Sequence, residues 1–161
     1  MEKDFGAWHA IKMQLQERQG PPFFREREVW FCALGANIGC EEDGKGEWFL
    51  RPVIILRRLD RNAFLSVPLT TQLKEGPFRY RIPFKGGIRM VLNSQVRMLD
   101  RKRLLRKMGT IDPNEFFWVM KEIGRLLPIK TAPLSLEKGA SEAEATDHPN
   151  ITGTIDFASS L

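Results

Sequence analysis

Short apolar runs follow one another along the middle of the chain, and Gly, Pro and Asn residues separate them. Five runs lie between Glu28 and Arg97, at residues 29–34, 53–56, 63–67, 78–83 and 88–92, and a sixth candidate lies at 104–108. Runs of this length, bounded by turn-forming residues, are typical of strands. Several short strands at close spacing favour a small, strongly twisted β-barrel or sandwich over a parallel sheet. The pattern therefore predicts a mainly β fold.

Two segments with a period near 3.6 residues flank this region. The first follows Asp4, a suitable N-cap, and ends at Gly20-Pro21-Pro22, so a helix is expected over 4–18. Its apolar positions are Phe5, Trp8, Ile11 and Leu15.

The second helix is predicted from Asp112 onward. Asp112 is an acidic N-cap, Pro113 takes the first helical position and Glu115 lies three residues after the cap. Pro128 is expected to end the helix. The face expected to pack on the barrel is Phe116, Met120, Ile123 and Leu127, and Phe117 is also expected in the core.

Charge divides the chain unequally, although its net charge is only +5. Residues 131–161 hold one basic and five acidic side chains, whereas residues 1–130 hold 24 basic and 15 acidic ones. We expect a helical extension over 1–25, a barrel domain over 26–128 and an acidic, disordered tail over 129–161. A body this basic suits a polyanionic partner, but a solvated basic surface has the same composition.

Nothing in the sequence indicates export or membrane insertion. No apolar run approaches the roughly 20 residues that span a bilayer, and the first residues lack the pattern of a signal peptide. We therefore expect a cytoplasmic protein in which Cys32 and Cys40 are reduced thiols. Neither these cysteines nor His9 and His148 are spaced as metal ligands, so no metal and no other cofactor is predicted.

Most candidate chemistry lies between Gly35 and Gln72. Arg51 stands where a glycine-rich loop becomes a strand-like run, and Thr70 and Thr71 stand where the next run ends. Arginine can fork onto two phosphate oxygens, and a hydroxyl can donate to another. The alternatives are a surface arginine paired with Glu47 or a neighbouring acid, and threonines that are structural.

The glycine-rich loop also carries three acids and an aromatic residue. Glu41, Glu42 or Asp43 could act as general base on a ribose 2′-hydroxyl, and Trp48 could stack on a base. A solvated acidic turn is the simpler interpretation of the acids. Further along lies the densest basic cluster, which suits either a nucleic-acid footprint or a solvated face. Its members are Arg97, Arg101, Lys102, Arg103, Arg106 and Lys107.

The residues available narrow the chemistry. The two histidines lie far apart in the sequence, so an enzyme built from this chain would work without a metal and without histidine acid–base catalysis. RNA suits such an enzyme, because its own 2′-hydroxyl is an internal nucleophile. DNA hydrolysis lacks that nucleophile and usually recruits metal ions.

Seven blocks, in order, make residues 26–127 resemble the MazF/PemK family, the ribonuclease toxins of bacterial toxin–antitoxin pairs, in its longer PemK-like branch. The blocks are Glu28-Val29-Trp30, Asn37-Ile38-Gly39, Gly44-Lys45-Gly46, Leu50-Arg51-Pro52-Val53, Pro68-Leu69-Thr70-Thr71, Ser94-Gln95-Val96-Arg97 and Arg103-Leu104-Leu105.

The resemblance implies an SH3-like barrel with a C-terminal helix, a homodimer and metal-independent cleavage of single-stranded RNA at a short sequence. Arg51 matches the family's catalytic arginine, Thr70 its catalytic hydroxyl and Glu41 a loop glutamate needed in some members. Residues expected to bind RNA are Lys45, Trp48, Thr71, Gln95 and Arg97. Ser94 and Leu92 depart from the family, since some PemK-like members place an acid–base aspartate and an arginine there.

These observations together predict a sequence-specific endoribonuclease toxin that is neutralised by a cognate antitoxin. Two alternatives have the same fold. One is a non-catalytic nucleic-acid-binding module, which would bind operator DNA together with an antitoxin. The other is a toxin directed at a protein, like a family of gyrase poisons with this barrel. Fold alone does not separate the three.

Overall fold

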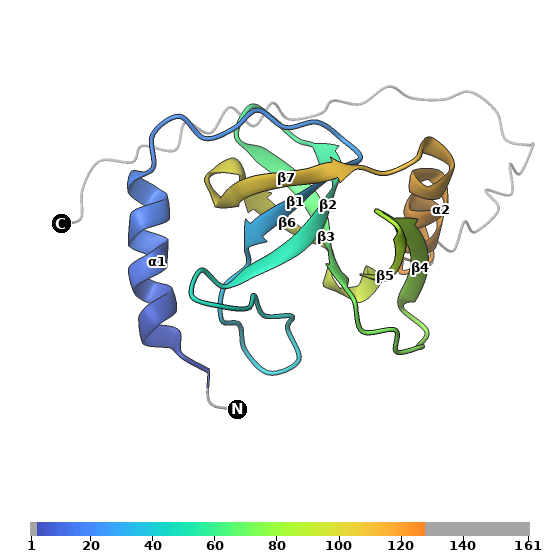
Figure 1. Cartoon of the computed structure of the whole chain (residues 1–161), viewed down its shortest axis with the longest axis horizontal. Helices are drawn as coiled ribbons and strands as arrows, with labels where there is room; N and C mark the ends of the chain where they lie inside the picture. The colour runs from blue at the N-terminus through green and yellow to red at the C-terminus, as the bar shows by residue number, and fades with distance from the viewer. Residues whose placement is uncertain (1–2, 128–161) are drawn as a thin grey trace, which may run out of the picture. The chain divides into compact units, whose positions relative to one another are not determined.

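The computed structural model describes residues 3–127, which form two α-helices, seven strands and two short 3-10 turns (Figure 1). The predicted tail over 129–161 lies outside the described residues. In chain order the elements are α1 (Phe5–Glu17), β1 (Glu28–Ala33), β2 (Leu50–Arg58), β3 (Ala63–Thr70), β4 (Arg79–Phe84), β5 (Gly87–Leu92), η1 (Asn93–Gln95), β6 (Arg97–Asp100), η2 (Arg101–Arg103), β7 (Leu104–Thr110) and α2 (Pro113–Gly124).

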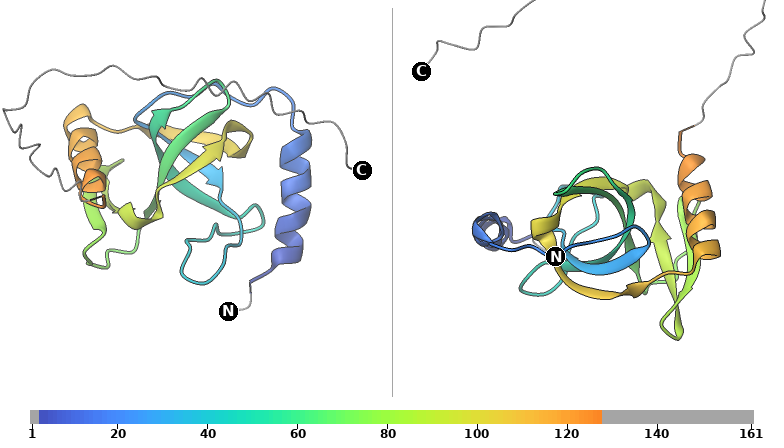
Figure 2. Two further views of the ribbon diagram at one scale, coloured as in Figure 1. Left: turned by 180° about the vertical axis from the view of Figure 1, so that it is seen from behind. Right: turned by 90° about the horizontal axis from the view of Figure 1, so that it is seen from above.

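The strands form one antiparallel sheet in the order β4-β5-β3-β2-β1-β7, and β6 pairs separately with β3. β3 is the central strand, because its first half pairs with both β2 and β6 while its end pairs with β5 through Leu69 and Val91. The sheet curls around on itself, as seen from above in Figure 2. The predicted mainly β barrel is therefore confirmed.

Alternation along the strands sends apolar side chains into two adjoining core clusters. One cluster contains Val29, Ile54 and Val67 and lies against α2, and the other contains Trp30, Val53 and Phe64. The predicted strands are all present, and several extend beyond the apolar runs. β2, for example, begins three residues before Val53, since backbone pairing with β1 continues through less apolar residues.

β6 is a strand that the apolar pattern did not predict. Its sequence is Arg97-Met98-Leu99-Asp100, in which only Leu99 is buried, so it carries almost no hydrophobic signal. Pairing of its backbone with β3 holds it in place.

α2 begins as predicted but packs on a narrower face. The Asp112 side chain accepts from the backbone N–H of Asn114, and Pro113 occupies the first turn. Val119 is fully buried, and Phe116 and Ile123 pack beside it on the core. The helix ends at Gly124, so Leu127 falls beyond it. The assignments of three residues to the packed face or core were wrong, since 38 to 76% of each is exposed: Phe117, Met120 and Leu127.

α1 matches the predicted N-terminal helix. Asp4 caps it by accepting from the N–H of Ala7 at 2.8 Å. Trp8 and Leu15 are buried, whereas Phe5, predicted on the same face, is half exposed. Trp8 packs where the chain leaves β1: a Cβ on Gly35, whose φ is +98°, would lie 2.3 Å from the Trp8 ring, so only glycine fits. Neither helix among residues 3–127 is long and apolar enough to cross a bilayer.

Candidate nuclease site

The β1–β2 loop, residues 34–49, is closed at its base by backbone hydrogen bonds. The N–H of Leu34 donates to the Phe49 carbonyl, and the N–H of Gly44 donates to the Gly35 carbonyl at 2.8 Å. Lys45 and Leu50 pair as an isolated bridge. A Cβ on Gly44 would lie 1.6 Å from the Phe49 carbonyl oxygen, so the two arms of the loop can approach this closely only with glycine there. The loop is therefore an ordered platform that delivers the chain to Arg51.

Arg51 is buried at the start of β2, with 6% of its surface exposed. Its Nη2 lies 2.5 Å from Glu42 Oε1, and its Nε donates to the Asp43 carbonyl at 2.6 Å. Burial lowers the pKa of the guanidinium below its usual value, while the charges of Glu42 and Asp43 act in the opposite direction. The alternative that Arg51 pairs with a nearby acid is thus correct in part, although the partner is Glu42 and the pair is not on the open surface.

This pairing uses one edge of the guanidinium. Nε and Nη2 lie on the same side of the planar fork, and both point at the loop. Nη1 makes no hydrogen bond with any residue between 3 and 127. The loop therefore sets the orientation of Arg51 and leaves the outer end of the fork for a ligand.

Arg51 opens onto a cavity of about 440 Å³. Four residues predicted from the sequence meet here from three parts of the chain, because Lys45 comes from the loop, Arg51 from β2, and Thr70 and Thr71 from the end of β3. The remaining walls come from Phe31, Gly46, Leu50, Pro52, Leu69, Arg89 and Met108. Three cationic side chains and two hydroxyls around one cavity suit an anionic ligand.

Arg89 is a cationic cavity residue that the sequence did not single out. It lies on β5, and pairing of Thr70 with Met90 brings β5 against the end of β3. No motif surrounds it, and one arginine within an apolar run resembles any exposed strand position. Only the β3–β5 register reveals it.

Thr70 retains a donor for the cavity. Its Oγ1 accepts from the N–H of Gln72 at 3.2 Å, a local turn contact that leaves the hydroxyl hydrogen free to point at a ligand. A threonine here is thus both structural and available.

Glu41 lies elsewhere in the loop. Its carboxylate accepts from the N–H of Ile38 at 3.1 Å, within its own turn, and it does not line the Arg51 cavity. Its neighbour Glu42 is the carboxylate that reaches Arg51. The backbone path through the loop therefore decides which of the two adjacent acids reaches Arg51.

Gln95 and Arg97 brace the loop from outside. Gln95 Oε1 accepts from the N–H of Glu42 at 3.0 Å and from Arg97 Nη2 at 3.2 Å, and its Nε2 donates to the Cys40 carbonyl. Neither side chain lines the cavity. In this arrangement Gln95 contacts the acidic turn, residues 41–43, directly, and Arg97 contacts Gln95. The acidic turn itself contacts Arg51 through Glu42 and Asp43.

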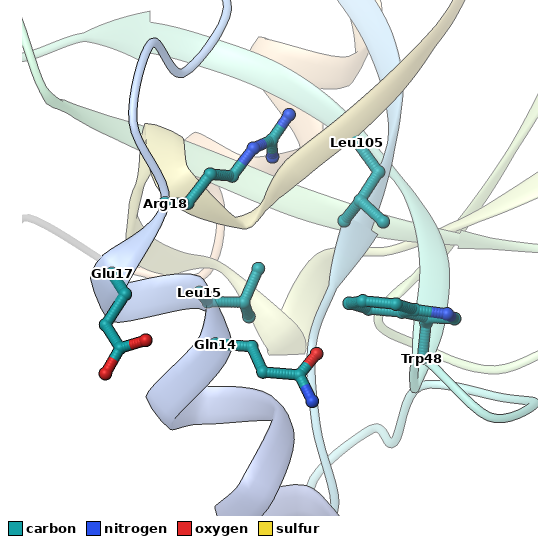
Figure 3. Close-up of a pocket in the computed structure, with 6 residues that line it drawn as sticks. All are labelled: Gln14, Leu15, Glu17, Arg18, Trp48 and Leu105. Atoms are coloured by element: carbon teal, nitrogen blue, oxygen red, sulfur yellow. The ribbon is translucent and has the colours of Figure 1, made fainter.

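Trp48 lies on a different cavity, of about 480 Å³, between the loop and α1. Figure 3 shows its ring beside Leu105 and Leu15, with Gln14 next to it and with Glu17 and Arg18 farther along the wall. Trp48 is 42% exposed. The structure thus separates Trp48 from the Arg51 cavity.

Most of the dense basic cluster makes contacts within the chain. Lys102 donates to the Gln16 carbonyl, Lys107 pairs with Glu28, and Arg106 lies 4.8 Å over the Phe31 ring. Arg103 donates to the Ala33 carbonyl at 2.9 Å and covers the Trp8 ring. The cysteines lie apart: Cys40 is exposed, whereas burial in β1 raises the pKa of the Cys32 thiol to about 12. Within 3–127, no three His, Cys, Asp or Glu side chains group as metal ligands.

Comparison with known proteins agrees with this architecture. Residues 25–127 match the model of the PemK-like, MazF-like toxins of type II toxin–antitoxin systems. A MazF crystal structure from Deinococcus radiodurans is similar, with a TM-score of 0.55 and 22% identity, over 67% of this chain and 97% of that one.

A second similar structure is an endoribonuclease in complex with its cognate antitoxin, from a mycobacterial species. Its TM-score is 0.50 with 18% identity, over 64% of this chain and 93% of that chain. No curated protein matched the sequence. Because the family model covers more than half of the chain, the protein belongs to the PemK-like, MazF-like toxins of type II toxin–antitoxin systems.

Proposed function

We propose that this toxin is a metal-independent endoribonuclease that cuts single-stranded RNA at a short sequence. The observation that carries the proposal is the convergence of Arg51 and Thr70 on one cavity, with Arg51 held by the loop and Lys45 and Arg89 beside it. The family match and the resemblance to a solved endoribonuclease support the same reaction.

The reaction that suits these residues is attack of a ribose 2′-oxygen on the adjacent phosphorus. The O2′–P bond forms and the P–O5′ bond breaks, which leaves a 2′,3′-cyclic phosphate and a 5′-hydroxyl. The proton of the 2′-hydroxyl is lost, and the departing O5′ gains one. No oxidant or further nucleophile is needed, so the chain has only to orient the RNA, stabilise charge and transfer protons.

Arg51 is the group proposed to stabilise the transition state. The phosphate gains charge as the fifth bond forms, and a guanidinium already oriented in a desolvated site stabilises it without reorganising. The Thr70 hydroxyl would donate to another phosphate oxygen, and Lys45 and Arg89 would hold neighbouring phosphates. Of the loop acids proposed to accept the 2′-hydroxyl proton, Glu42 contacts Arg51, although neither it nor Glu41 lines the cavity.

We further propose a cognate antitoxin as partner, a homodimer as the active form, and binding of operator DNA by the toxin–antitoxin complex. The family description and the antitoxin bound in the mycobacterial structure support the first. Exposed apolar side chains on α2 support the second, since Phe117, Trp118 and Met120 are each at least 38% exposed and the Phe117 and Trp118 rings pack edge to face.

The decisive experiment is incubation of the purified protein with a long single-stranded RNA in EDTA, followed by mapping of the new 5′ ends. We expect cuts at one short motif, with 5′-hydroxyl termini, that disappear in Arg51→Ala and in Thr70→Ala. Trp118→Ser, a change on α2 at a residue that does not line the cavity, tests the dimer separately by sedimentation.

Other outcomes would contradict the proposal. Intact RNA would favour a binding module or a protein-directed toxin, and cleavage that persists in Arg51→Ala would point to a contaminating nuclease. Cleavage that requires added Mg²⁺ would remove the metal-independent mechanism.

A further inference from the structure

α1 contacts the β1–β2 loop at both of its arms. Trp8 fills the space beside Gly35, and its ring lies 5.6 Å from the ring of Phe49 at the other end of the loop. Figures 1 and 2 show α1 beside the barrel, on the side from which this loop projects. The family model begins at residue 25, so α1 lies outside the part of the chain that defines the family.

Lys3, just before α1, reaches the middle of the same loop. Its Nζ donates to the Asn37 carbonyl at 2.6 Å and to the Gly39 carbonyl at 3.3 Å. It also lies 3.0 Å from Asp43 Oδ2. One ammonium group therefore uses its three donors on three separate residues of the loop.

Asp43 connects this contact to the candidate site. Its Oδ1 accepts from the N–H of Asn37 at 2.7 Å, and its backbone carbonyl accepts from Arg51 Nε at 2.6 Å. Lys3 is thus two contacts away from the guanidinium. Asn37 adds a parallel link, since its Nδ2 donates to the carbonyl of Glu42, the ion-pair partner of Arg51.

We propose that the N-terminal segment is a positioning element for the nuclease site, in which Lys3 holds Asp43 and thereby the orientation of Arg51. This proposal rests on the proposed ribonuclease function for its effect on rate, but not for its effect on the loop. Lys3 does not line the cavity, and its hydrogen bonds and ion pair go to loop residues outside the cavity, so it is a positioning residue and not a catalytic one.

The contacts favour positioning over simple attachment of a helix. Trp8 and Leu15 already bury the apolar face of α1, so Lys3 is not needed to hold the helix. The Lys3 ammonium donates to two backbone carbonyls and to the Asp43 carboxylate. Without a cation between them, these oxygen atoms would repel one another. Removing the ammonium leaves the Arg51 guanidinium, already paired with Glu42, as the cation bonded to the acidic turn, so a change in the turn acts directly on Arg51.

The test compares four proteins: wild type, Lys3→Ala, Lys3→Arg and Lys12→Ala. Lys12 is the matched control, because it is an exposed lysine of α1 with no hydrogen bond or ion pair to any residue of 3–127. Two readouts are taken from each protein. One is hydrogen–deuterium exchange of residues 37–44, and the other is kcat and KM for cleavage of a short RNA containing the mapped motif.

We expect Lys3→Ala to speed exchange over 37–44 about tenfold, as loss of a charge-assisted contact does, while β2 and β3 stay protected. We expect kcat to fall about three- to tenfold at nearly constant KM, because a misoriented Arg51 weakens the transition state more than the ground state. Lys3→Arg should recover most of both effects, and Lys12→Ala should match wild type.

Unchanged exchange over 37–44 in Lys3→Ala would overturn the proposal, and so would a rise in kcat, which would make the segment an inhibitor. If the wild-type protein does not cleave RNA, the proposed function fails, yet the exchange data still decide whether Lys3 orders the loop.

Discussion

Two basic regions of this toxin differ in what their cations do. The cluster between Arg97 and Lys107 has the higher density of positive charge along the chain, whereas the cavity at Arg51 draws single cations from the loop, β2 and β5. In the cluster, Arg97, Lys102 and Arg103 donate to side chains or carbonyls of the same chain. In the cavity, Arg51 is oriented by the loop and still has unused donors.

The difference shows that charge density in a sequence does not predict available charge. A run of cations on a short strand and turn can tie neighbouring segments together, as Arg103 does between β1 and α1. A binding site needs donors that remain unsatisfied and point at one place, and that property depends on segments distant in sequence.

The largest expected effect is that of Arg51→Lys. Lysine keeps the charge but cannot bond the Asp43 carbonyl and Glu42 while presenting a second pair of donors. We expect kcat/KM for RNA cleavage to fall about 10²- to 10³-fold with little change in melting temperature. The matched change in the cluster is Arg101→Lys, for which we expect cleavage within about twofold of wild type, because Arg101 does not line the cavity. Equal losses of kcat/KM in Arg51→Lys and Arg101→Lys would contradict the distinction between the cavity and the basic cluster.

Next in size is Gly44→Ala. The added Cβ would meet the Phe49 carbonyl, so the loop must open and Arg51 loses its fixed geometry. We expect cleavage to drop about 10- to 100-fold, since misplacement by about 1 Å can cost 10²-fold. Gly39→Ala is the control: its φ is +56°, but nothing lies within 4 Å of a new Cβ. Cleavage by Gly39→Ala should stay within a few-fold of wild type. A larger loss in Gly39→Ala than in Gly44→Ala would contradict an ordered loop.

Glu28→Gln tests the basic cluster, because Glu28 is the ion-pair partner of Lys107. Burial favours a higher pKa for Glu28, but hydrogen bonds from Lys107, Trp30 and the Arg25 N–H outweigh it and lower the pKa. A lowered folded-state pKa gives stability that is complete above the unfolded value, near 4.5, and is lost as the pH falls through the lower folded value.

We therefore expect Glu28→Gln to reduce the free energy of unfolding at pH 7 by about 1–2 kcal/mol. It should also flatten the dependence of stability on pH below about pH 4.5, which denaturant unfolding at several pH values would measure. Cleavage per folded molecule should not change. If Glu28→Gln loses cleavage but no stability, Lys107 and Glu28 belong to the nuclease site.

The smallest expected effect concerns salt. Arg89→Gln should remove one phosphate contact, so the slope of log affinity against log salt should decrease by about 0.7 for single-stranded RNA. Arg101→Gln should leave that slope unchanged. Fluorescence anisotropy with an RNA whose 2′-hydroxyls are replaced by hydrogen gives both slopes without cleavage. A decrease of the salt slope in Arg101→Gln would show that the basic cluster also binds RNA phosphates.

Much of the fold could be predicted because local signals agree with the tertiary structure. The Asp112-Pro113 start of α2 and the strands around Ile54 and Val67 depend on capping and alternation, which act over a few residues. β6 could not be predicted, since pairing with β3 and not its own hydrophobicity makes it a strand. Phe117 and Met120 could not be placed, because the width of the packed face depends on what lies beneath the helix.

For the site, residue types made Arg51 and Thr70 candidates, since a cation before a buried strand and a hydroxyl at a strand end suit a phosphate, and the resemblance to the MazF/PemK family singled them out. Only the tertiary structure showed that Glu42 and not Glu41 reaches Arg51, that Arg89 joins the cavity, that Trp48 lies apart and that Lys3 reaches Asp43. Residue chemistry is local and can be read in order along the chain. Direction and proximity arise from sheet register and from the path of the loop, which the chain acquires only on folding.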